Sequence, residues 1–331
     1  MIPYSKEISL IALLFLLNAC NPFSSHKKFV LLSARESQIG FNNQLVENDS
    51  LNYFTYAYMY MGGGVSIGDI NNDQLPDIYF TGNMVPNKLY LNKGNMIFED
   101  ISDAAGVAGD HRWYTGTTMI DINNDGLLDI YVSVSGKFAP RTNQLFINNG
   151  DLTFTESAAN YGLDAEEEII QTTFFDYDQD GDLDAFLANY PSTSFRTPNV
   201  KYQFLKYAKD LEKSDRLLEQ QADGTFKDVT EAAGILNFGL AISASIADFN
   251  NDGLEDIYVS NDFSTPDFLY LNNGDGTFTD KIKESTNQTA FYGMGTDAAD
   301  INNDGLIDLM QVDMAAQDNR RQKANMASMN P

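Results

Sequence analysis

An all-β fold, and within that class a β-propeller of four-stranded blades, is predicted by three observations on this sequence. An acidic nine-residue motif of the general form Asp-x-Asn-x-Asp-Gly-x-x-Asp occurs five times, at nearly constant intervals, with strand-forming segments between its copies. The copies are Asp69–Asp77, Asp121–Asp129, Asp176–Asp184, Asp248–Asp256 and Asp300–Asp308. Their first residues are 52, 55, 72 and 52 positions apart, so one repeat carries an insertion. Intervals near 50 residues are typical of propellers and solenoids.

The unit between two motifs predicts four short strands, as the second repeat shows most clearly. Gly116–Asp121 leads into the acidic loop as strand A, and Ile130–Val134 leads out of it as strand B. Strands C and D follow in Asn143–Glu156, where Asn-Asn-Gly-Asp between β-rich runs is a strong hairpin signal. The hairpin recurs at Lys88–Phe98, Leu217–Phe226 and Phe268–Phe278. Four strands per repeat make a propeller blade, whereas period-two alternation and β-forming residues exclude a solenoid of helix pairs.

The N-terminus predicts export and lipid anchoring. Ile8–Leu17 is an apolar run too short to span a bilayer, and Ala19 precedes the single cysteine, Cys20, as in a lipoprotein signal peptide. We therefore expect residues 1–19 to be a signal peptide and residues 20–29 a tether lipidated at Cys20. This predicts a membrane-anchored lipoprotein of the bacterial envelope, at the outer membrane or the cell surface, with the lipid at Cys20 as its contact with the membrane.

Composition limits the partners. The formal net charge is −26, with 47 acidic against 21 basic residues, which argues against nucleic acid as a partner. The content of 43% hydrophobic and 12% aromatic residues is that of a folded protein, so disorder does not explain the charge. The acidity therefore calls for another explanation, and the repeated loops supply one.

The acidic loops have the spacing of calcium sites. Side-chain oxygens fall at positions 1, 3, 5 and 9, and Gly occupies position 6 in four of the five loops. Ca²⁺ takes six or more oxygen ligands, and a loop that turns at the Gly can direct these side chains and the carbonyl of position 7 inward. Up to five Ca²⁺ ions are therefore predicted. The alternative is a set of metal-free Asp/Asn turns, which these residues favour locally.

The predicted side-chain ligands are Asp69, Asn71, Asp73, Asp77, Asp121, Asn123, Asp125, Asp129, Asp176, Asp178, Asp180, Asp184, Asp248, Asn250, Asp252, Asp256, Asp300, Asn302, Asp304 and Asp308. The predicted carbonyl ligands are Leu75, Leu127, Asp182, Leu254 and Leu306. An EF-hand would need Glu at position 12 and flanking helices. Position 12 instead holds Phe80, Val132, Leu187, Val259 and Gln311, and strands follow, so an EF-hand is excluded.

Together these motifs resemble a known family. The loop followed by Ile-Tyr, the hairpin Asn-x-Leu-Tyr-x-Asn-x-Gly-x-x-Phe-x-Asp and the sequence Ala-Ala-Gly are similar to FG-GAP/VCBS repeats, in particular those of the cartilage-acidic-protein-like (ASPIC/UnbV-associated) lipoproteins. The resemblance implies that residues 30–331 form an integrin-α-like propeller, usually of seven blades. It also implies calcium in the loops between strands A and B, on the face opposite the ligand-binding loops.

Two departures from the family pattern modify this expectation. Gln74 stands where the other four loops have Gly, and the chain stops 23 residues after Asp308. We therefore expect about five to six blades, incomplete relative to seven, and an N-terminal fragment of a longer protein.

The expected function is a calcium-stabilised binding or adhesion module without catalysis of its own. Only two histidines occur, His26 in the tether and His111 before a predicted strand A, which leaves no material for a Ser/His/Asp triad or a zinc site. The alternative is a polysaccharide-acting propeller enzyme, a lyase or hydrolase, or an accessory protein for glycan uptake. Arg112, Trp113 and Tyr114 beside His111 are its best candidates, although packing at a blade junction also explains them.

The insertion of the third blade, residues 191–214, departs from the acidic background. It is rich in lysine and aromatic residues and lies between strands B and C, so it emerges on the face opposite the calcium loops. It could be a plain loop with one or two helical turns, or it could recognise a glycan or a protein. The candidate ligand-face residues are Arg112, Trp113, Tyr114, Arg196, Lys201 and Tyr202.

Overall fold

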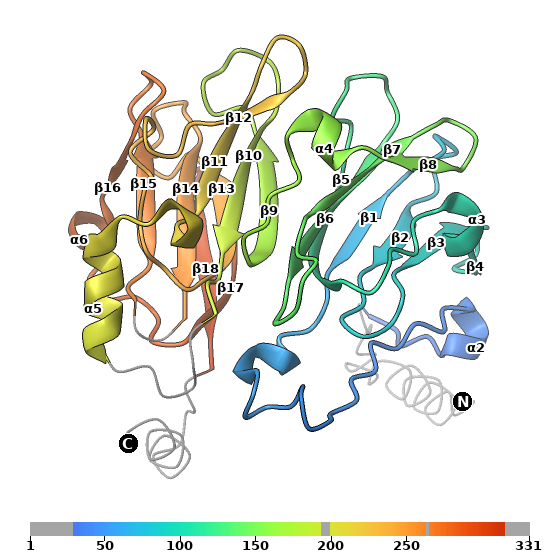
Figure 1. Ribbon diagram of the computed structural model, residues 1–331. Helices are drawn as coiled ribbons and strands as arrows, with labels where there is room; N and C mark the ends of the chain where they lie inside the picture. Colours follow the sequence, from blue (N-terminus) through green and yellow to red (C-terminus); the bar gives the residue numbers. More distant parts are fainter. Residues whose placement is uncertain (1–28, 193–198, 263–264, 315–331) are drawn as a thin grey trace, which may run out of the picture.

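The computed structural model describes residues 29–192, 199–262 and 265–314, and within them the predicted blades are present. Four antiparallel sheets of four strands and one sheet of two strands follow one another along the chain (Figure 1). The strands of blades 1 and 2 are β1 (Val65–Gly68), β2 (Asp77–Phe80), β3 (Lys88–Asn92), β4 (Phe98–Asp100), β5 (Trp113–Ile120), β6 (Asp129–Ser135), β7 (Gln144–Asn148) and β8 (Phe154–Glu156).

The later blades repeat the same order. Their strands are β9 (Ile169–Phe175), β10 (Asp184–Asn189), β11 (Arg216–Gln220), β12 (Phe226–Asp228), β13 (Ala241–Ala247), β14 (Asp256–Asn261), β15 (Phe268–Asn272), β16 (Phe278–Asp280), β17 (Gly293–Ala299) and β18 (Asp308–Asp313). Each A strand contacts the A strand of the next blade, so the sheets stand side by side with strand A innermost. Over the described residues, the fold is thus a β-propeller with four complete blades and the first half of a fifth.

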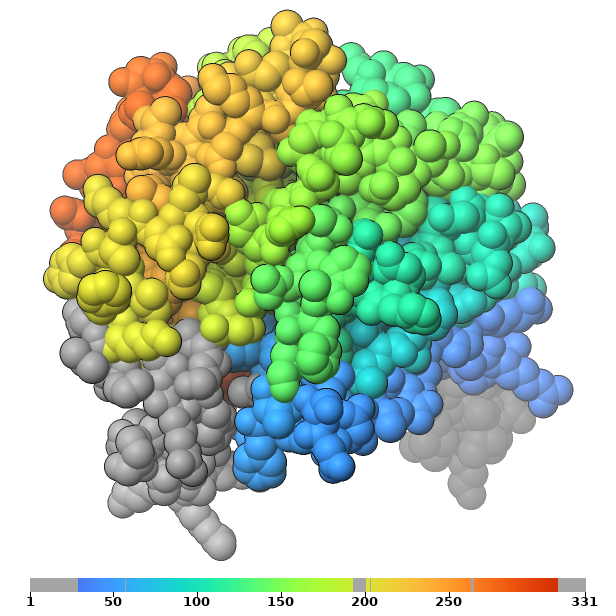
Figure 2. Space-filling view, in the orientation of Figure 1, coloured from blue at the N-terminus to red at the C-terminus, as the bar shows by residue number. Residues whose placement is uncertain are grey.

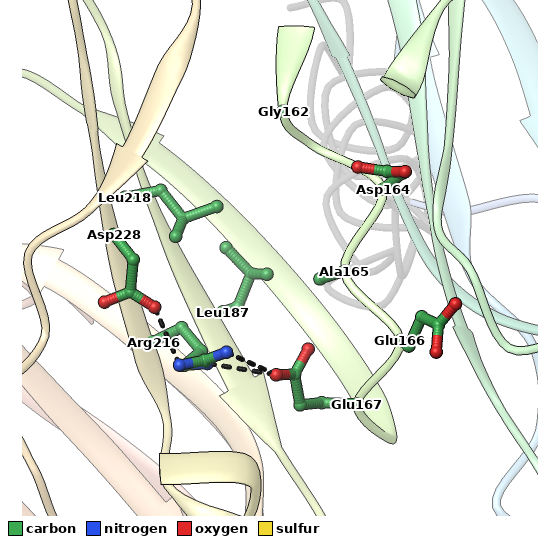
Figure 3. A pocket seen from close by; sticks show the side chains of 9 residues that line it. All are labelled: Gly162, Asp164, Ala165, Glu166, Glu167, Leu187, Arg216, Leu218 and Asp228. Atoms are coloured by element: carbon green, nitrogen blue, oxygen red, sulfur yellow. Dashed lines mark hydrogen bonds and ion pairs between the residues drawn. The ribbon is translucent and has the colours of Figure 1, made fainter. Parts of the chain in front are cut away.

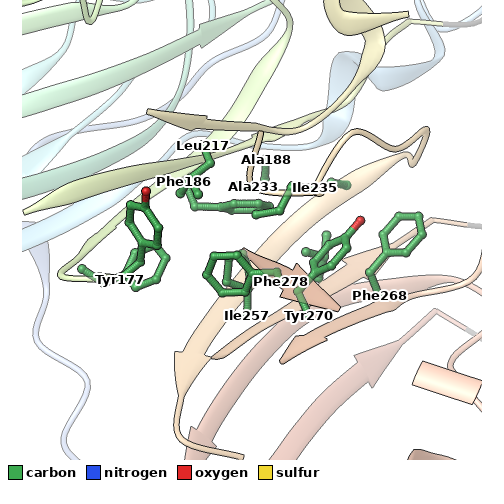
Figure 4. Packing of buried hydrophobic residues seen from close by; sticks show 14 residues of the cluster. Tyr177, Phe186, Ala188, Leu217, Ala233, Ile235, Ile257, Phe268, Tyr270 and Phe278 are labelled. Carbon is green, nitrogen blue, oxygen red and sulfur yellow. The ribbon is translucent and has the colours of Figure 1, made fainter. Parts of the chain in front are cut away.

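The core lies between neighbouring blades. Between blades 3 and 4, Phe186 and Leu217 of one sheet face Ile257, Val259 and other buried residues of the next (Figure 4). Equivalent apolar clusters join blades 1 and 2 and blades 2 and 3. The strand B segments consist largely of β-forming apolar residues because both of their faces are covered, as in β6, where every residue is buried.

Short helices join successive blades. After strand D come α3 (Ser102–Ala105), α4 (Ala158–Tyr161) and α6 (Ile282–Ser285). The first two end at Gly106 and Gly162, whose φ angles of 77° and 72° are left-handed and favour glycine. The Ala-Ala-Gly part of the sequence motif is therefore a helix stop that turns the chain toward the next blade.

A segment ahead of the first blade, residues 45–61, crosses the side of the propeller that carries the B–C and D–A connections, and we call it the strap. Helix α2 (Ala34–Ser37) precedes it, capped by reciprocal hydrogen bonds between Ser33 and Glu36, and the 3-10 helix η1 (Ala57–Tyr60) ends it. Leu51, Tyr56 and Met59 of the strap are buried against blade 2. The face opposite the acidic loops is therefore partly covered, which the repeat pattern did not predict.

The insertion of blade 3 contains α5 (Asn199–Ala208) and the 3-10 helix η2 (Leu211–Lys213). Helix α5 is ten residues long, more than the one or two turns expected. It lies on the same lower side of the molecule as the strap in Figure 1. Its buried side chains pack on blades 3 and 4 at Tyr190, Phe238 and Leu240.

Candidate metal-binding loops and ligand face

The five acidic motifs occupy the five loops between strands A and B, as predicted. In the second loop, Asp121 accepts hydrogen bonds from the amides of Asp125 (3.0 Å) and Gly126 (2.8 Å). Asp125 in turn accepts one from the amide of Leu127 (2.9 Å). The same three hydrogen bonds recur in the other four loops. Each loop therefore fixes the carboxylates of positions 1 and 5 through its own backbone.

The loop backbone turns twice through left-handed conformations, at positions 4 and 6. The second of these is glycine in four loops, and at Gly126 φ is 86°. In the first loop Gln74 adopts the same conformation, with φ of 69°, and its amide still donates to Asp69 (2.6 Å). The departure from glycine therefore leaves the loop geometry intact, at the backbone cost of a side chain in this region.

The aspartate at position 9 joins each loop to its blade. Asp129 is fully buried, and it accepts hydrogen bonds from the amides of Ile122 (3.2 Å) in the loop and Asn148 (2.7 Å) at the end of strand C. Asp77, Asp184 and Asp256 make the same pair of bonds in blades 1, 3 and 4. Position 9 is thus part of the blade's hydrogen-bond network whether or not it also binds a metal.

A further residue, which the sequence analysis did not single out, links adjacent blades at the loops. The side-chain amide of Asn148, at the end of strand C, donates to the carbonyl of Ile70 in the preceding blade's loop (2.8 Å). Gln220 and Asn272 make the equivalent bonds to Ile122 (3.2 Å) and Tyr177 (2.7 Å). The signal was available in the sequence, because an amide residue stands at this place in every hairpin motif.

Carboxylates are most crowded in the third loop. One oxygen each of Asp176, Asp178 and Asp184 lies within 4.8 Å of the others. Burial raises the pKa of Asp184 to about 7, and the neighbouring acidic groups add to the effect. Burial and the adjacent Asp180 raise the pKa of Asp182 to about 6, and one of its oxygens is buried without a hydrogen-bond donor. These hard oxygen donors fit Ca²⁺, which would relieve both the repulsion and the unmatched acceptor.

The structure contradicts part of the predicted ligand face. Trp113, Tyr114 and Tyr202 are 8%, 0% and 5% exposed, so the interpretation of their side chains as ligand contacts is wrong. Trp113 packs edge-on against Tyr56 of the strap, with 5.5 Å between ring centroids. The hydroxyl of Tyr114 donates to Gln144 (2.8 Å) inside the junction between blades 1 and 2. Packing at a blade junction, the alternative considered for Trp113 and Tyr114, is what the structure shows for both.

The remaining candidates have different surroundings. Arg112 donates to the carbonyl of Thr142 (3.2 Å) and lies 3.5 Å from Asp110, so it is held at the blade junction. Lys201 is exposed on α5, while the ring of the adjacent Tyr202 packs against Phe238. Arg196 lies outside the described residues, as do the predicted signal peptide, Cys20 and His26. No helix in the described part of the chain is long and apolar enough to cross a bilayer.

Exposed aromatic side chains nevertheless gather on the strap side. Phe54 and Tyr60 of the strap are 84% and 60% exposed, and Phe204 and Tyr207 of α5 are 70% and 78% exposed. Figure 2 shows the strap (blue) and the insertion (yellow) along the same lower side of the molecule. The side opposite the acidic loops therefore presents apolar rings beside the lysines of α5.

Comparison with known proteins agrees with the repeat pattern. A family model described as FG-GAP-like repeat matches residues 69–132, 207–259 and 248–310, together just over half of the chain. A solved structure of an Agrocybe aegerita lectin, described as recognising non-reducing terminal N-acetylglucosamine, has a TM-score of 0.42 at 20% identity, over 78% of this chain and 62% of that chain.

Cartilage acidic protein 1 is similar in sequence. The protein from Xenopus tropicalis is 28% identical over 206 residues, 61% of this chain and 29% of its own length. That from Homo sapiens is 28% identical over 235 residues, 70% of this chain and 33% of its own length. The chain thus spans about a third of the length of these relatives. On the family match, the loops and the blades, this chain belongs to the FG-GAP-like repeat family.

Proposed function

We propose that the chain is a calcium-stabilised binding module of the bacterial envelope, without catalysis of its own and anchored through a lipid at Cys20. The observation that carries the proposal is the repeated loop, in which carboxylates at positions 1, 5 and 9 are fixed by backbone amides in the same way in blade after blade. Such loops are a rigid set of oxygen donors, and the exposed side chains opposite them are free to contact a ligand.

Calcium would act on stability rather than on chemistry. Ca²⁺ bound by Asp176, Asp178 and Asp184, and by the equivalent residues of the other loops, would neutralise carboxylates that approach one another only in the folded chain. By mass action, each site would contribute about 2.7 kcal/mol at a hundredfold excess of calcium over its Kd. Up to five such sites would make the fold strongly calcium-dependent.

Calorimetry of the chain with calcium and with EGTA tests this proposal. We expect a markedly lower melting temperature in EGTA and bound calcium by elemental analysis. A matched control is Asp223→Asn, which removes a carboxylate that is bonded to Thr225 in the β11–β12 turn, outside the acidic loops, and should keep the full calcium response. Identical melting curves in the two buffers would show that the loops are metal-free turns.

The binding face proposed here is the strap side, with Phe204 and Tyr207 as the exposed rings that α5 contributes. Deleting the whole insertion is a poor test, because the deletion would also remove the buried Tyr202 and so expose Tyr190 and Phe238, against which it packs. The double variant F204S/Y207S removes only exposed rings and should keep the melting temperature. It should no longer bind the ligands that the unmodified chain captures from glycan and protein arrays. The control variant Met96→Ser, which changes an exposed residue of the β3–β4 turn, should still bind them.

The anchor is tested by incorporation of radiolabelled fatty acid. Cys20 is the only cysteine and would be the acyl acceptor, so Cys20→Ala should abolish labelling and leave an unanchored precursor. Equal labelling of the variant and the parent chain would rule out this anchor.

A further inference from the structure

A pocket of about 330 Å³ opens between blades 2 and 3, away from the acidic loops (Figure 3). One wall is the connection from α4 to β9, residues 162–167, and the other is formed by Leu187 of β10 and Leu218 of β11. Arg216 lies at one end of the pocket between Glu167 and Asp228, while Asp164 lies at the other end (Figure 3). Its volume is in the range of small-molecule sites.

The repeats provide an internal control for this space. Leu218 pairs with strand B in the register position at which the other three complete blades have aromatic residues, namely Tyr90, Phe146 and Tyr270. In blade 4, Phe268 and Tyr270 stack at 5.4 Å, and the hydroxyl of Tyr270 accepts a hydrogen bond from Asn237 of the preceding connection (2.8 Å). The stacked rings close the junction between blades 3 and 4. Blade 3 has Arg216 and Leu218 at the positions of Phe268 and Tyr270. The corresponding space, at the junction between blades 2 and 3, is the open pocket.

Arg216 is held in this pocket by two carboxylates. Its guanidinium lies 2.5 Å from Glu167 and 2.7 Å from Asp228, and its side chain is 16% exposed. Lys88, at the same register position in blade 1, pairs with one carboxylate, Asp100, so Glu167 is the added partner in blade 3. A guanidinium fixed between two carboxylates offers donors and acceptors side by side in fixed directions.

We propose that this pocket binds a single uncharged, hydroxyl-rich ring, that is, one sugar residue of a glycan. Leu187 and Leu218 provide an apolar wall for the C–H face of such a ring, and Arg216 with its two carboxylates can both donate to and accept from neighbouring hydroxyls. An anion would meet four carboxylates for one guanidinium. A cation inside the pocket would have to compete with Arg216 for Glu167 and Asp228, because Asp164 and Glu166 are exposed to solvent. The proposal rests on the proposed binding function and names its ligand, but it depends neither on calcium nor on Cys20.

The test is saturation-transfer difference NMR of the full chain with the methyl glycosides of glucose, galactose, mannose and fucose at millimolar concentration. We expect transfer to at least one of them, and none to methylammonium or acetate. Leu218→Tyr restores the aromatic residue of blades 1 and 4 and should fold normally, since the fold already accommodates it there. It should weaken sugar binding by about tenfold or more, because the ring fills the pocket.

Two further variants separate the possible outcomes. Arg216→Gln does not fill the pocket but removes the ordered guanidinium donors, and it should also weaken binding about tenfold. Sugar binding that survives both L218Y and R216Q but is lost in F204S/Y207S would overturn the pocket while leaving the proposed binding function intact. No transfer to any glycoside, or transfer to methylammonium alone, would also overturn the proposal, and arrays of proteins would then remain the test of the binding function.

Discussion

Blade 2 has Asn123 at the third loop position and Asn143 before strand C, whereas blade 3 has Asp178 and Asp215 at the same places. Three of the further differences change charge or side-chain volume, with Leu127, Gln144 and Phe146 of blade 2 corresponding to Asp182, Arg216 and Leu218 of blade 3. The two blades nevertheless share their backbone hydrogen bonds. The hydrogen-bond network that builds each blade is therefore constant between the two blades, whereas the charge and volume of other side chains vary. Blade 3 differs from blade 2 in both charge and volume.

The largest expected effect concerns the constant network. Asp129→Ala leaves the buried amides of Ile122 and Asn148 without an acceptor, which should destabilise the fold by about 4 kcal/mol even in EGTA. Asp125→Ala, in the exposed part of the same loop, should cost little in EGTA but should remove the calcium response of that loop. Urea unfolding of both variants with and without calcium measures the difference. Equal losses in EGTA would mean that position 9 has no structural role of its own.

The next effect concerns Asp215, which accepts hydrogen bonds from the amide of Asn189 (2.9 Å) and the side chain of Asn237 (2.8 Å). Burial raises the pKa of Asp215 to about 6. A raised carboxyl pKa means that the folded chain holds the proton more tightly than the unfolded chain, so the stability from this group is present at low pH and is lost as the pH rises from about 4 through about 6. The full effect of about two pKa units is about 3 kcal/mol.

Asp215→Asn should remove this pH dependence. Relative to the parent chain, its free energy of unfolding should rise by about 1.4 kcal/mol between about pH 5 and about pH 7. The reciprocal variant Asn143→Asp places a carboxyl at the equivalent position of blade 2, beside the hydroxyl of Tyr131. Its free energy of unfolding should therefore fall as the pH rises, as that of the parent chain does because of Asp215. Urea titrations at the two pH values measure both changes, and parallel pH profiles for D215N and the parent chain would contradict the prediction.

A smaller effect is expected from exchanging loop charge between the blades. Asp178→Asn gives the third loop the same predicted side-chain ligands as the second, and Asn123→Asp gives the second loop those of the third. Calcium affinity rises with the number of ligand charges, so we expect a change of about tenfold, or about 1.4 kcal/mol, in opposite directions at the two sites. In calorimetric calcium titrations, the tightest class of sites should lose one member in D178N and gain one in N123D. An unchanged stoichiometry in both variants would show that charge does not set the order of the sites.

The smallest effect concerns the first loop. Gln74→Gly replaces a residue at φ of 69° by one that adopts this conformation freely, so the variant should be more stable by about 1 kcal/mol. Thermal unfolding in excess calcium measures this. A lower melting temperature would mean that the glutamine side chain contributes contacts that outweigh the backbone cost.

The features that repeat along the chain could be predicted from the sequence. The blades, the positions of the acidic loops and the left-handed turn at Gln74 follow from the five copies, since each copy constrains the others. The strap was not predictable, because its order comes from tertiary packing of Leu51 and Met59 rather than from a local pattern. The burial of Tyr114 and Tyr202 was missed for a related reason. A tyrosine beside basic residues looks the same in sequence whether its ring faces solvent or a neighbouring blade.

The amide bridges between blades also bear on the order of events during folding. The carbonyl of Ile70 accepts its hydrogen bond from a residue 78 positions later in the chain. The carbonyls of Ile122 and Tyr177 accept theirs from residues 98 and 95 positions later. A loop therefore acquires its last partner only when strand C of the following blade has formed. Each blade that forms then completes the hydrogen bonds of the blade before it.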